Sequence, residues 1–288
     1  MDTALRQVLL KAQRNEITEY HIYSRLTRIV TEPENKRTLQ HIADDEYRHY
    51  KVWKKYTGVD VGPNRLKMWF YYLISRIFGF TFGIKLMEAG EEKAQVDYKN
   101  LPEEISEAHA VAEDENDHEN ELIEILDEER LRYTGSVVLG LNDALVELTG
   151  ALAGLTLALQ NTRLIALTGM ITGVAAAFSM AASEYLSTKS EEDEKSPPKA
   201  SLYTGTAYIM TVALLILPYL LIDNYYLCLA VSLMIAVIII ALFNYYIAVA
   251  KSLPFRSRFL EMAGLSLGVA ALSFGMGYLI RLWLGVEV

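Results

Sequence analysis

The sequence predicts an all-α protein with two parts: a four-helix bundle over residues 1–132, followed by a five-helix transmembrane domain over residues 133–288. Three observations predict this architecture. Charged residues are dense up to Arg132 and sparse beyond it. After that point, apolar runs approach the ~20 residues that a helix needs to cross a bilayer. In the first part, apolar residues such as Leu5, Leu9 and Ala12 recur with a helical period, which is typical of amphipathic helices.

Composition narrows the class of protein further. The net charge of -9 argues against a nucleic-acid partner and suits a protein that gathers cations. The single cysteine, Cys228, lies in an apolar run, so one chain can form neither a disulfide nor a cysteine-based zinc site. Residues 1–16 are polar and lack the apolar segment of a signal peptide, which predicts that the N-terminal domain stays in the cytosol.

Prolines and glycines divide the first domain into helices. Pro33 suits a first helical turn, and Pro102 opens another helix in the same way. Four helices are predicted, over residues 3–30, 33–56, 64–100 and 102–131. Because short connections place consecutive helices side by side and antiparallel, these four form a bundle.

A repeated pair of side chains carries the chemistry of this bundle. The second helix contains Glu46 and His49 and the fourth contains Glu115 and His118, both in the pattern Glu-x-x-His. A step of three residues puts carboxylate and imidazole on one helix face. The other two helices each supply a glutamate with a tyrosine seven residues later: Glu16 with Tyr23, and Glu91 with Tyr98.

One glutamate from each of two helices and Glu-x-x-His from each of the other two is the ligand set of a di-iron bundle. Bridging carboxylates hold redox-active Fe or Mn. Either motif alone would suit a solvated acidic face, but the doubled set in order on four helices favours a metal site. In the third helix Glu88, Glu91 and Glu92 compete for the ligand position, and Glu19 is a rival to Glu16.

With these motifs, residues 5–130 resemble the rubrerythrin and bacterioferritin branch of the ferritin-like superfamily. The resemblance implies a di-iron centre that oxidises Fe(II) with oxygen or peroxide. No Cys-x-x-Cys pair follows the bundle, so the electron delivery of rubrerythrins has no visible route here. His21 and His41 lie outside the ligand pattern and are expected at the surface or in packing.

The start of the third helix is unusually aromatic between Trp69 and Met87. Arg76 interrupts its centre, so we do not expect it to span the membrane. An apolar face larger than one bundle needs indicates either a homodimer interface or contact with the membrane surface, and the first is favoured.

Five membrane spans are predicted in the second domain, over residues 136–159, 164–186, 202–222, 225–249 and 259–283. Most lysines and arginines near the span ends gather on one side, including Lys189, Lys251 and Arg256. The positive-inside rule then places the N-terminal bundle in the cytoplasm.

Two acids interrupt the first predicted span. Asp143 and Glu147 are four residues apart and share one helix face. An acid near the middle of a span costs roughly 2.5–3.5 kcal/mol, which favours a metal or proton pathway over a structural role. In the second span Met180 and Glu184 also share a face. The four side chains would form a ladder for a divalent cation, and the thioether favours Fe(II).

Two segments carry a second resemblance: Leu139-Gly-Leu-Asn-Asp-Ala-Leu-Val146 and Phe178-Ser-Met-Ala-Ala-Ser-Glu-Tyr-Leu-Ser187. They resemble the vacuolar iron transporter (VIT) family, over residues 135–285. The resemblance implies export of Fe(II), often also Mn(II), from the cytosol in exchange for protons. It implies a homodimer with the pore between subunits, lined by Asp143 and Met180, with Glu184 in the second-span motif.

Many relatives carry a long acidic insert after the second span, but here only residues 188–200 link the spans. The bundle would then capture the metal, as in the membrane-bound ferritins of prokaryotes, which implies a prokaryotic cell membrane. We therefore expect an exporter of Fe(II) or Mn(II) with metal ions and protons as partners. The rival from another class is an enzyme, a membrane-anchored ferroxidase or peroxidase. Iron storage is disfavoured, because a tethered bundle is poorly placed to build a shell.

Overall fold

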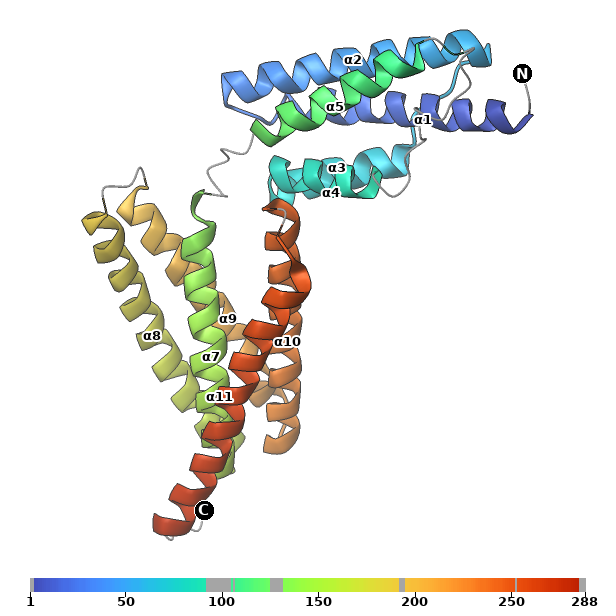
Figure 1. Cartoon of the computed structure of the whole chain (residues 1–288). Helices are drawn as coiled ribbons and strands as arrows, with labels where there is room; N and C mark the ends of the chain where they lie inside the picture. The colour runs from blue at the N-terminus through green and yellow to red at the C-terminus, as the bar shows by residue number, and fades with distance from the viewer. Residues whose placement is uncertain are drawn as a thin grey trace. The chain divides into compact units, whose positions relative to one another are not determined.

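The computed structural model describes residues 3–91, 105, 107–124, 132–191, 195–251 and 253–284 (Figure 1). Within these residues the chain forms ten α-helices. It divides into two compact units, Met1–Glu128 and Glu129–Val288. The all-helical class predicted from the sequence is therefore confirmed.

The N-terminal unit contains five of the described helices: α1 (Thr3–Leu26), α2 (Pro33–Thr57), α3 (Arg65–Phe78), α4 (Phe80–Glu91) and α5 (Ala108–Glu124). Helices α1 and α2 run side by side, and α5 packs on α2 (Figure 1). Pro33 occupies the first turn of α2, as the sequence predicts. The predicted fourth helix extends beyond α5 at both ends, into residues that lie largely outside the described part of the chain.

The prediction of one continuous third helix is wrong. The helix ends at Phe78, and α4 starts at Phe80 and packs against α3. The residue between them, Gly79, has φ of 102° and ψ of 149°, a backbone conformation that residues with a β-carbon rarely adopt. A glycine with positive φ can redirect the chain where an unbroken apolar pattern predicts a longer helix.

Two apolar clusters hold the N-terminal unit together. One joins Ile22 of α1 and Leu39 of α2 to Met68 of α3 and Met87 of α4. The other joins Leu9 and Trp53 to Val111 of α5. Between these clusters, the polar side chains of the candidate metal site are also buried.

The second unit contains α7 (Thr134–Leu159), α8 (Thr162–Ser190), α9 (Pro197–Leu221), α10 (Tyr225–Ala250) and α11 (Phe255–Leu284). All five are long and apolar enough to cross a membrane, so the predicted spans are confirmed in number and place within the described residues. Most of the large side chains exposed on α8, α10 and α11 are apolar, as expected for helices in contact with lipid.

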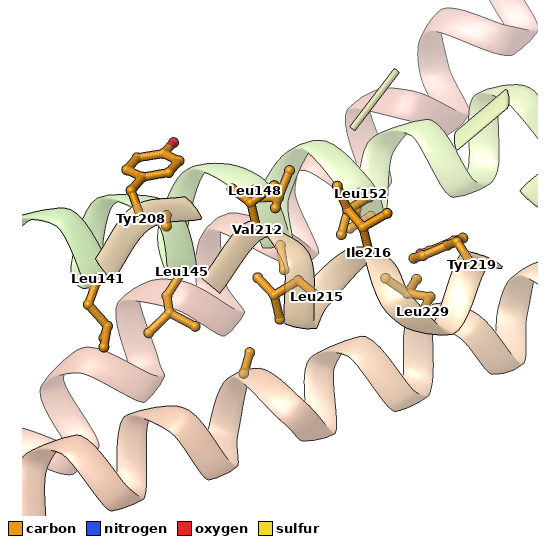
Figure 2. Close-up of a cluster of buried hydrophobic side chains, with 14 of the residues drawn as sticks. Leu141, Leu145, Leu148, Leu152, Tyr208, Val212, Leu215, Ile216, Tyr219 and Leu229 are labelled. Carbon is orange, nitrogen blue, oxygen red and sulfur yellow. The ribbon is translucent and has the colours of Figure 1, made fainter. Parts of the chain in front are cut away.

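Helix α7 is central to this unit and packs against α8, α9, α10 and α11. Its buried residues Leu141, Leu145, Leu148 and Leu152 follow steps of four and three residues, so they form one stripe. Figure 2 shows this stripe lying along α9, whose Tyr208, Val212 and Leu215 belong to the same cluster.

Small residues let α7 and α11 approach closely. A Cβ added at Gly277 would lie 2.5 Å from the carbonyl oxygen of Gly154. Three other glycines of α11, Gly264, Gly268 and Gly275, have no neighbouring atom within 4 Å of such a Cβ. Of these glycines, Gly277 is thus the one that the packing of a single chain requires.

We expect Gly277→Ala to destabilise the membrane unit by about 1–3 kcal/mol, because the new methyl group must push two helix backbones apart. Gly275→Ala is the matched control, and it should be neutral or slightly stabilising, since alanine favours a helix over glycine. The measurement is thermal unfolding in detergent. Equal effects of the two substitutions would contradict this account of the α7–α11 contact.

Candidate functional site

Four polar side chains from three helices meet inside the N-terminal unit. Glu16 of α1, Glu46 and His49 of α2, and Glu115 of α5 each offer one ligand atom, and these atoms all lie within 4.8 Å of one another. Glu16, Glu46 and His49 are 1–2% exposed. Such a group of carboxylates and imidazole is rarely buried unless it is paired or binds an ion.

Local contacts decide which glutamate of α1 enters this cluster. The indole nitrogen of Trp53 donates a hydrogen bond of 2.9 Å to Oε1 of Glu16. Glu19 lies one turn further along and forms an ion pair with Lys67, with 3.4 Å between Nζ and Oε1. The structure therefore brings Glu16, and not Glu19, to the other candidate ligands.

The two histidines present the same ring nitrogen to the cluster. Nδ1 of His49 lies 3.5 Å from Oε1 of Glu115 and 3.6 Å from Oε2 of Glu16. Nδ1 of His118 lies 3.5 Å from Oε1 of Glu46. The two rings have centroids 5.9 Å apart. His118 therefore joins the group on the side of Glu46.

The other ring nitrogens point to aspartates. Nε2 of His49 lies 3.1 Å from Oδ2 of Asp114, and Nε2 of His118 lies 3.2 Å from Oδ2 of Asp45. With the proton on Nε2, each imidazole donates to its aspartate and keeps Nδ1 available to accept a metal. Aspartates that orient histidine ligands in this way are a usual feature of metal sites.

Sequence reasoning missed these aspartates, although the sequence contains the signal. Asp45 precedes Glu46 and Asp114 precedes Glu115, so the repeated motif is Asp-Glu-x-x-His. Each aspartate binds the histidine of the other helix, so the two motifs are exchanged across α2 and α5. Trp53 was also missed, because its hydrogen bond to Glu16 joins residues far apart in the chain.

Unsatisfied atoms show that these residues fit a metal ion. Nδ1 of His49, Nδ1 of His118 and Oε2 of Glu46 are buried and have no hydrogen-bond partner within the described residues. Each buried polar atom without a partner destabilises the folded protein by about 1–3 kcal/mol. Divalent cations bound between these residues would satisfy all three atoms, and carboxylate with imidazole donors suit Fe(II) or Mn(II).

Electrostatics of the metal-free cluster favour bound protons. Burial raises the pKa of Glu46 well above its ordinary value, and the carboxylates of Glu115 and Glu16 raise it further. Burial also raises the pKa of Glu115, to about 7. Burial alone would lower the pKa of His49, but the carboxylates of Glu115 and Glu16 outweigh it and raise the pKa to about 10.

The remaining predicted ligands lie outside what the structure describes. Glu88 and Glu91 belong to α4, but their side chains are not described, and Glu92 and Tyr98 fall among residues that are not described at all. The ligand position of the third predicted helix therefore stays a prediction. His41 is exposed and lies 3.5 Å from Glu121 and 3.8 Å from Asp45, so it borders the aspartate that orients His118 and is not one of the four grouped ligands.

In the membrane unit, the two acids of α7 lie in different surroundings. Glu147 accepts a hydrogen bond of 2.8 Å from the hydroxyl of Tyr208 of α9. It lines a cavity of about 470 Å³, together with Thr172 of α8 and Ser273 of α11. Asp143 is half-buried one turn earlier on α7. Its neighbour Asn142 has a buried side-chain oxygen without a hydrogen-bond partner in the described part, a polar group that sequence reasoning did not single out.

A hydrogen bond between α7 and α8 fixes how Met180 and Glu184 of α8 lie along the helix pair relative to the two acids of α7. Ser136 donates to Oε1 of Glu184 across 2.5 Å. The two helices are antiparallel and rise ~1.5 Å per residue, so distances can be counted along them from this bond toward the turn that joins α7 to α8. Met180 lies ~6 Å from the bond in that direction, Asp143 ~10 Å and Glu147 ~16 Å. The four residues therefore follow one another in the order Glu184, Met180, Asp143, Glu147 along the unit.

Metal binding to the bundle separates Glu16 from its rival. The test uses a chain that carries Asp143→Asn and Glu147→Gln, so that the membrane acids do not bind metal. In this background Glu16→Gln should lower Mn(II) affinity by at least ~100-fold, because removal of a ligand costs more than removal of a residue that only orients a ligand. Glu19→Gln, the matched control on the same helix, should leave the affinity nearly unchanged. Calorimetric titration of the full chain in detergent measures both. Equal losses would contradict the cluster as the binding site.

Metal binding should also release protons. In the metal-free site His49 holds a proton at neutral pH because its pKa is about 10, and Glu115 is about half protonated at its pKa of about 7. A metal must displace these protons, so affinity should rise ~10-fold per pH unit for each proton released. Titration in buffers of different ionisation heat counts the protons. Affinity that does not change between about pH 6 and 8 would exclude His49 as a ligand.

Part of the membrane unit is similar to a known protein family. Residues 134–196 match the VIT family, and this segment contains α7, α8 and the four membrane residues above. No curated protein matches the chain. With five helices able to cross a bilayer, the chain is an integral membrane protein with a VIT family domain at residues 134–196, and the match indicates a transporter of iron or manganese.

Proposed function

We propose that this protein exports Fe(II), with Mn(II) as an alternative substrate, from the cytosol in exchange for protons. The observation that carries the proposal is the pair of carboxylates, Asp143 and Glu147, on a membrane-spanning helix inside the VIT match. Acids in such a position are costly unless they serve an ion path. Glu147 also lines a cavity, as a passage for cations requires.

The order of side chains along the membrane unit supports a direction of travel. Glu184 would receive the cation at the mouth, and Met180, Asp143 and Glu147 would follow at increasing depth. Two of these carboxylates already accept hydrogen bonds from hydroxyl groups: Glu184 from Ser136, and Glu147 from Tyr208. An arriving cation would displace these hydroxyls from the carboxylate oxygens. Several weak binding sites along a path let an ion leave as readily as it enters.

Coupling to protons follows from the same oxygens. A carboxylate that binds a divalent cation must lose its proton, so metal and proton compete for Asp143 and Glu147. Protons arriving from the far side would displace the metal there. The protonated acids would then return without a net charge, which lowers the cost of their exposure to the membrane interior.

Exposure of Glu147 supports a homodimer. In a single chain this side chain is exposed, although it belongs to a membrane-spanning helix. An acid that faced lipid would be costly, whereas a pore between two subunits would surround it with protein and water. The resemblance to the VIT family implies the same arrangement.

The excess of basic residues near Lys189 and Lys251 supports a cytoplasmic N-terminal unit.

In this proposal the N-terminal unit is a ferritin-like domain that captures metal. Glu16, Glu46, His49, Glu115 and His118 would hold a di-iron or di-manganese centre. Such a centre, when bound, supplies the oxidation of Fe(II) by oxygen or peroxide. The chain contributes the ligand set, the two aspartates that orient the histidines, and apolar clusters on either side that keep water away.

The second candidate function is a membrane-anchored ferroxidase or peroxidase. The specific observation in its favour is that the buried cluster is assembled entirely within the N-terminal unit. Such an enzyme would need the membrane helices only as an anchor. An anchor, however, gains nothing from Asp143 and Glu147, and the exporter is therefore favoured.

Vesicle transport separates the two functions. Proteoliposomes that are acidic inside and loaded with an Fe(II) indicator should take up Fe(II), because protons leave down their gradient in exchange for it. Asp143→Asn with Glu147→Gln should lower this flux by at least ~10-fold, equivalent to the loss of about 1.4 kcal/mol or more of metal binding. Glu191→Gln, at the exposed end of α8, is the control and should leave the flux unchanged.

Oxygen consumption by the same preparations tests the enzyme. If the double substitution leaves Fe(II) flux intact while oxygen consumption depends on Glu46 and Glu115, the anchored enzyme is the correct function. If Fe(II) flux falls in the double variant of the membrane acids and persists in Glu46→Gln, the result supports the exporter.

A further inference from the structure

Helix α3 exposes an apolar strip that the proposed transport does not use. The strip consists of Leu66, Trp69, Phe70, Leu73 and Ile77, which are 48–85% exposed. Their spacing of three and four residues places them on one helix face. The opposite face packs against the bundle through Met68, so the strip is not needed for the core.

Basic side chains border this strip. Arg65 and Arg76 are exposed and, at 100° per residue, project near one edge of it. Neither forms an ion pair within the described residues. The guanidinium of Arg25 from α1 lies over the ring of Trp69, 4.7 Å from its centroid. Tryptophan, phenylalanine and leucine on one face with basic residues at its border are typical of helices that lie in a membrane interface.

Size argues against a second copy of the chain as the partner of this strip. A stable protein interface takes about 20–30 residues from each partner, whereas the strip has five residues on a helix of 14 residues. A lipid interface needs no such area, because its strength scales with the apolar side chains that insert and with the basic residues that meet anionic lipid. Homodimer contact through this face, which the sequence favours, is thus the weaker explanation.

We infer that α3 lies in the headgroup region of an anionic bilayer, with Leu66, Phe70, Leu73 and Ile77 inserted toward the acyl chains and Arg65 and Arg76 at the phosphates. Apolar burial and attraction to anionic lipid both contribute to such binding. This inference does not depend on transport, and a protein that carries no metal could have the same contact.

The test uses the single cysteine of the chain. In a Cys228→Ser background, a spin label is attached at Leu73→Cys or, as control, at Lys36→Cys on the exposed face of α2. The full protein is placed in vesicles of phosphatidylcholine with phosphatidylglycerol. Collisions with oxygen, which concentrates in lipid, are compared with collisions with a water-soluble nickel chelate.

We expect the Leu73 label to favour oxygen over the nickel chelate several-fold more than the Lys36 label does. Arg65→Glu with Arg76→Glu should reduce this preference by roughly two-fold or more in the anionic vesicles, and much less in phosphatidylcholine alone. A label at Phe70→Cys provides a second position, and circular dichroism verifies that each variant is folded.

Two results would overturn the inference. If the Leu73 label meets the nickel chelate as often as the Lys36 label, α3 faces water. If it meets neither reagent, and its spectrum is broadened by a second label until unlabelled protein is mixed in, the strip is covered by a second copy of the chain.

Discussion

Both units of this protein depend on one constraint: ionisable side chains in a protein core or in a membrane-spanning helix are costly unless a partner satisfies them. In the bundle, aspartates satisfy only the outer nitrogen of each histidine, and the inner nitrogens are left to a cation. In the membrane unit, hydroxyl groups of Tyr208 and Ser136 satisfy the carboxylates of Glu147 and Glu184. The first arrangement suits tight binding of an ion, and the second suits an ion that passes, since a hydroxyl is readily displaced.

Much of the fold could be predicted from the sequence, because helices and spans are encoded by local periodicity. The five spans follow from apolar runs of sufficient length, and the shared face of Glu46 and His49 follows from a step of three residues. The break at Gly79 could not be predicted in the same way. Residues on both sides of it continue the apolar pattern, and the positive φ is apparent only in the folded chain.

Contacts between distant residues set the limit of prediction for the sites. Asp45 and Asp114 each precede a predicted ligand, but their role depends on the partner histidine of another helix. Tyr208 belongs to α9 and no pattern in the sequence links it to Glu147, yet their hydrogen bond helps define the cavity. Spacing can therefore give the face of one helix, while the identity of the facing residue requires the three-dimensional packing.

If the bundle supplies metal to the membrane unit, the ion must leave a site with more nitrogen and carboxylate donors for one with fewer. That transfer is unfavourable if the bundle binds the ion without competition. Protons provide the competition, since the metal-free site has a histidine with a pKa of about 10 and a glutamate with a pKa of about 7. Each proton regained when the ion leaves offsets part of the lost binding energy. At neutral pH the bundle would then act as a reversible buffer, which is the property that a capture site ahead of an exporter needs.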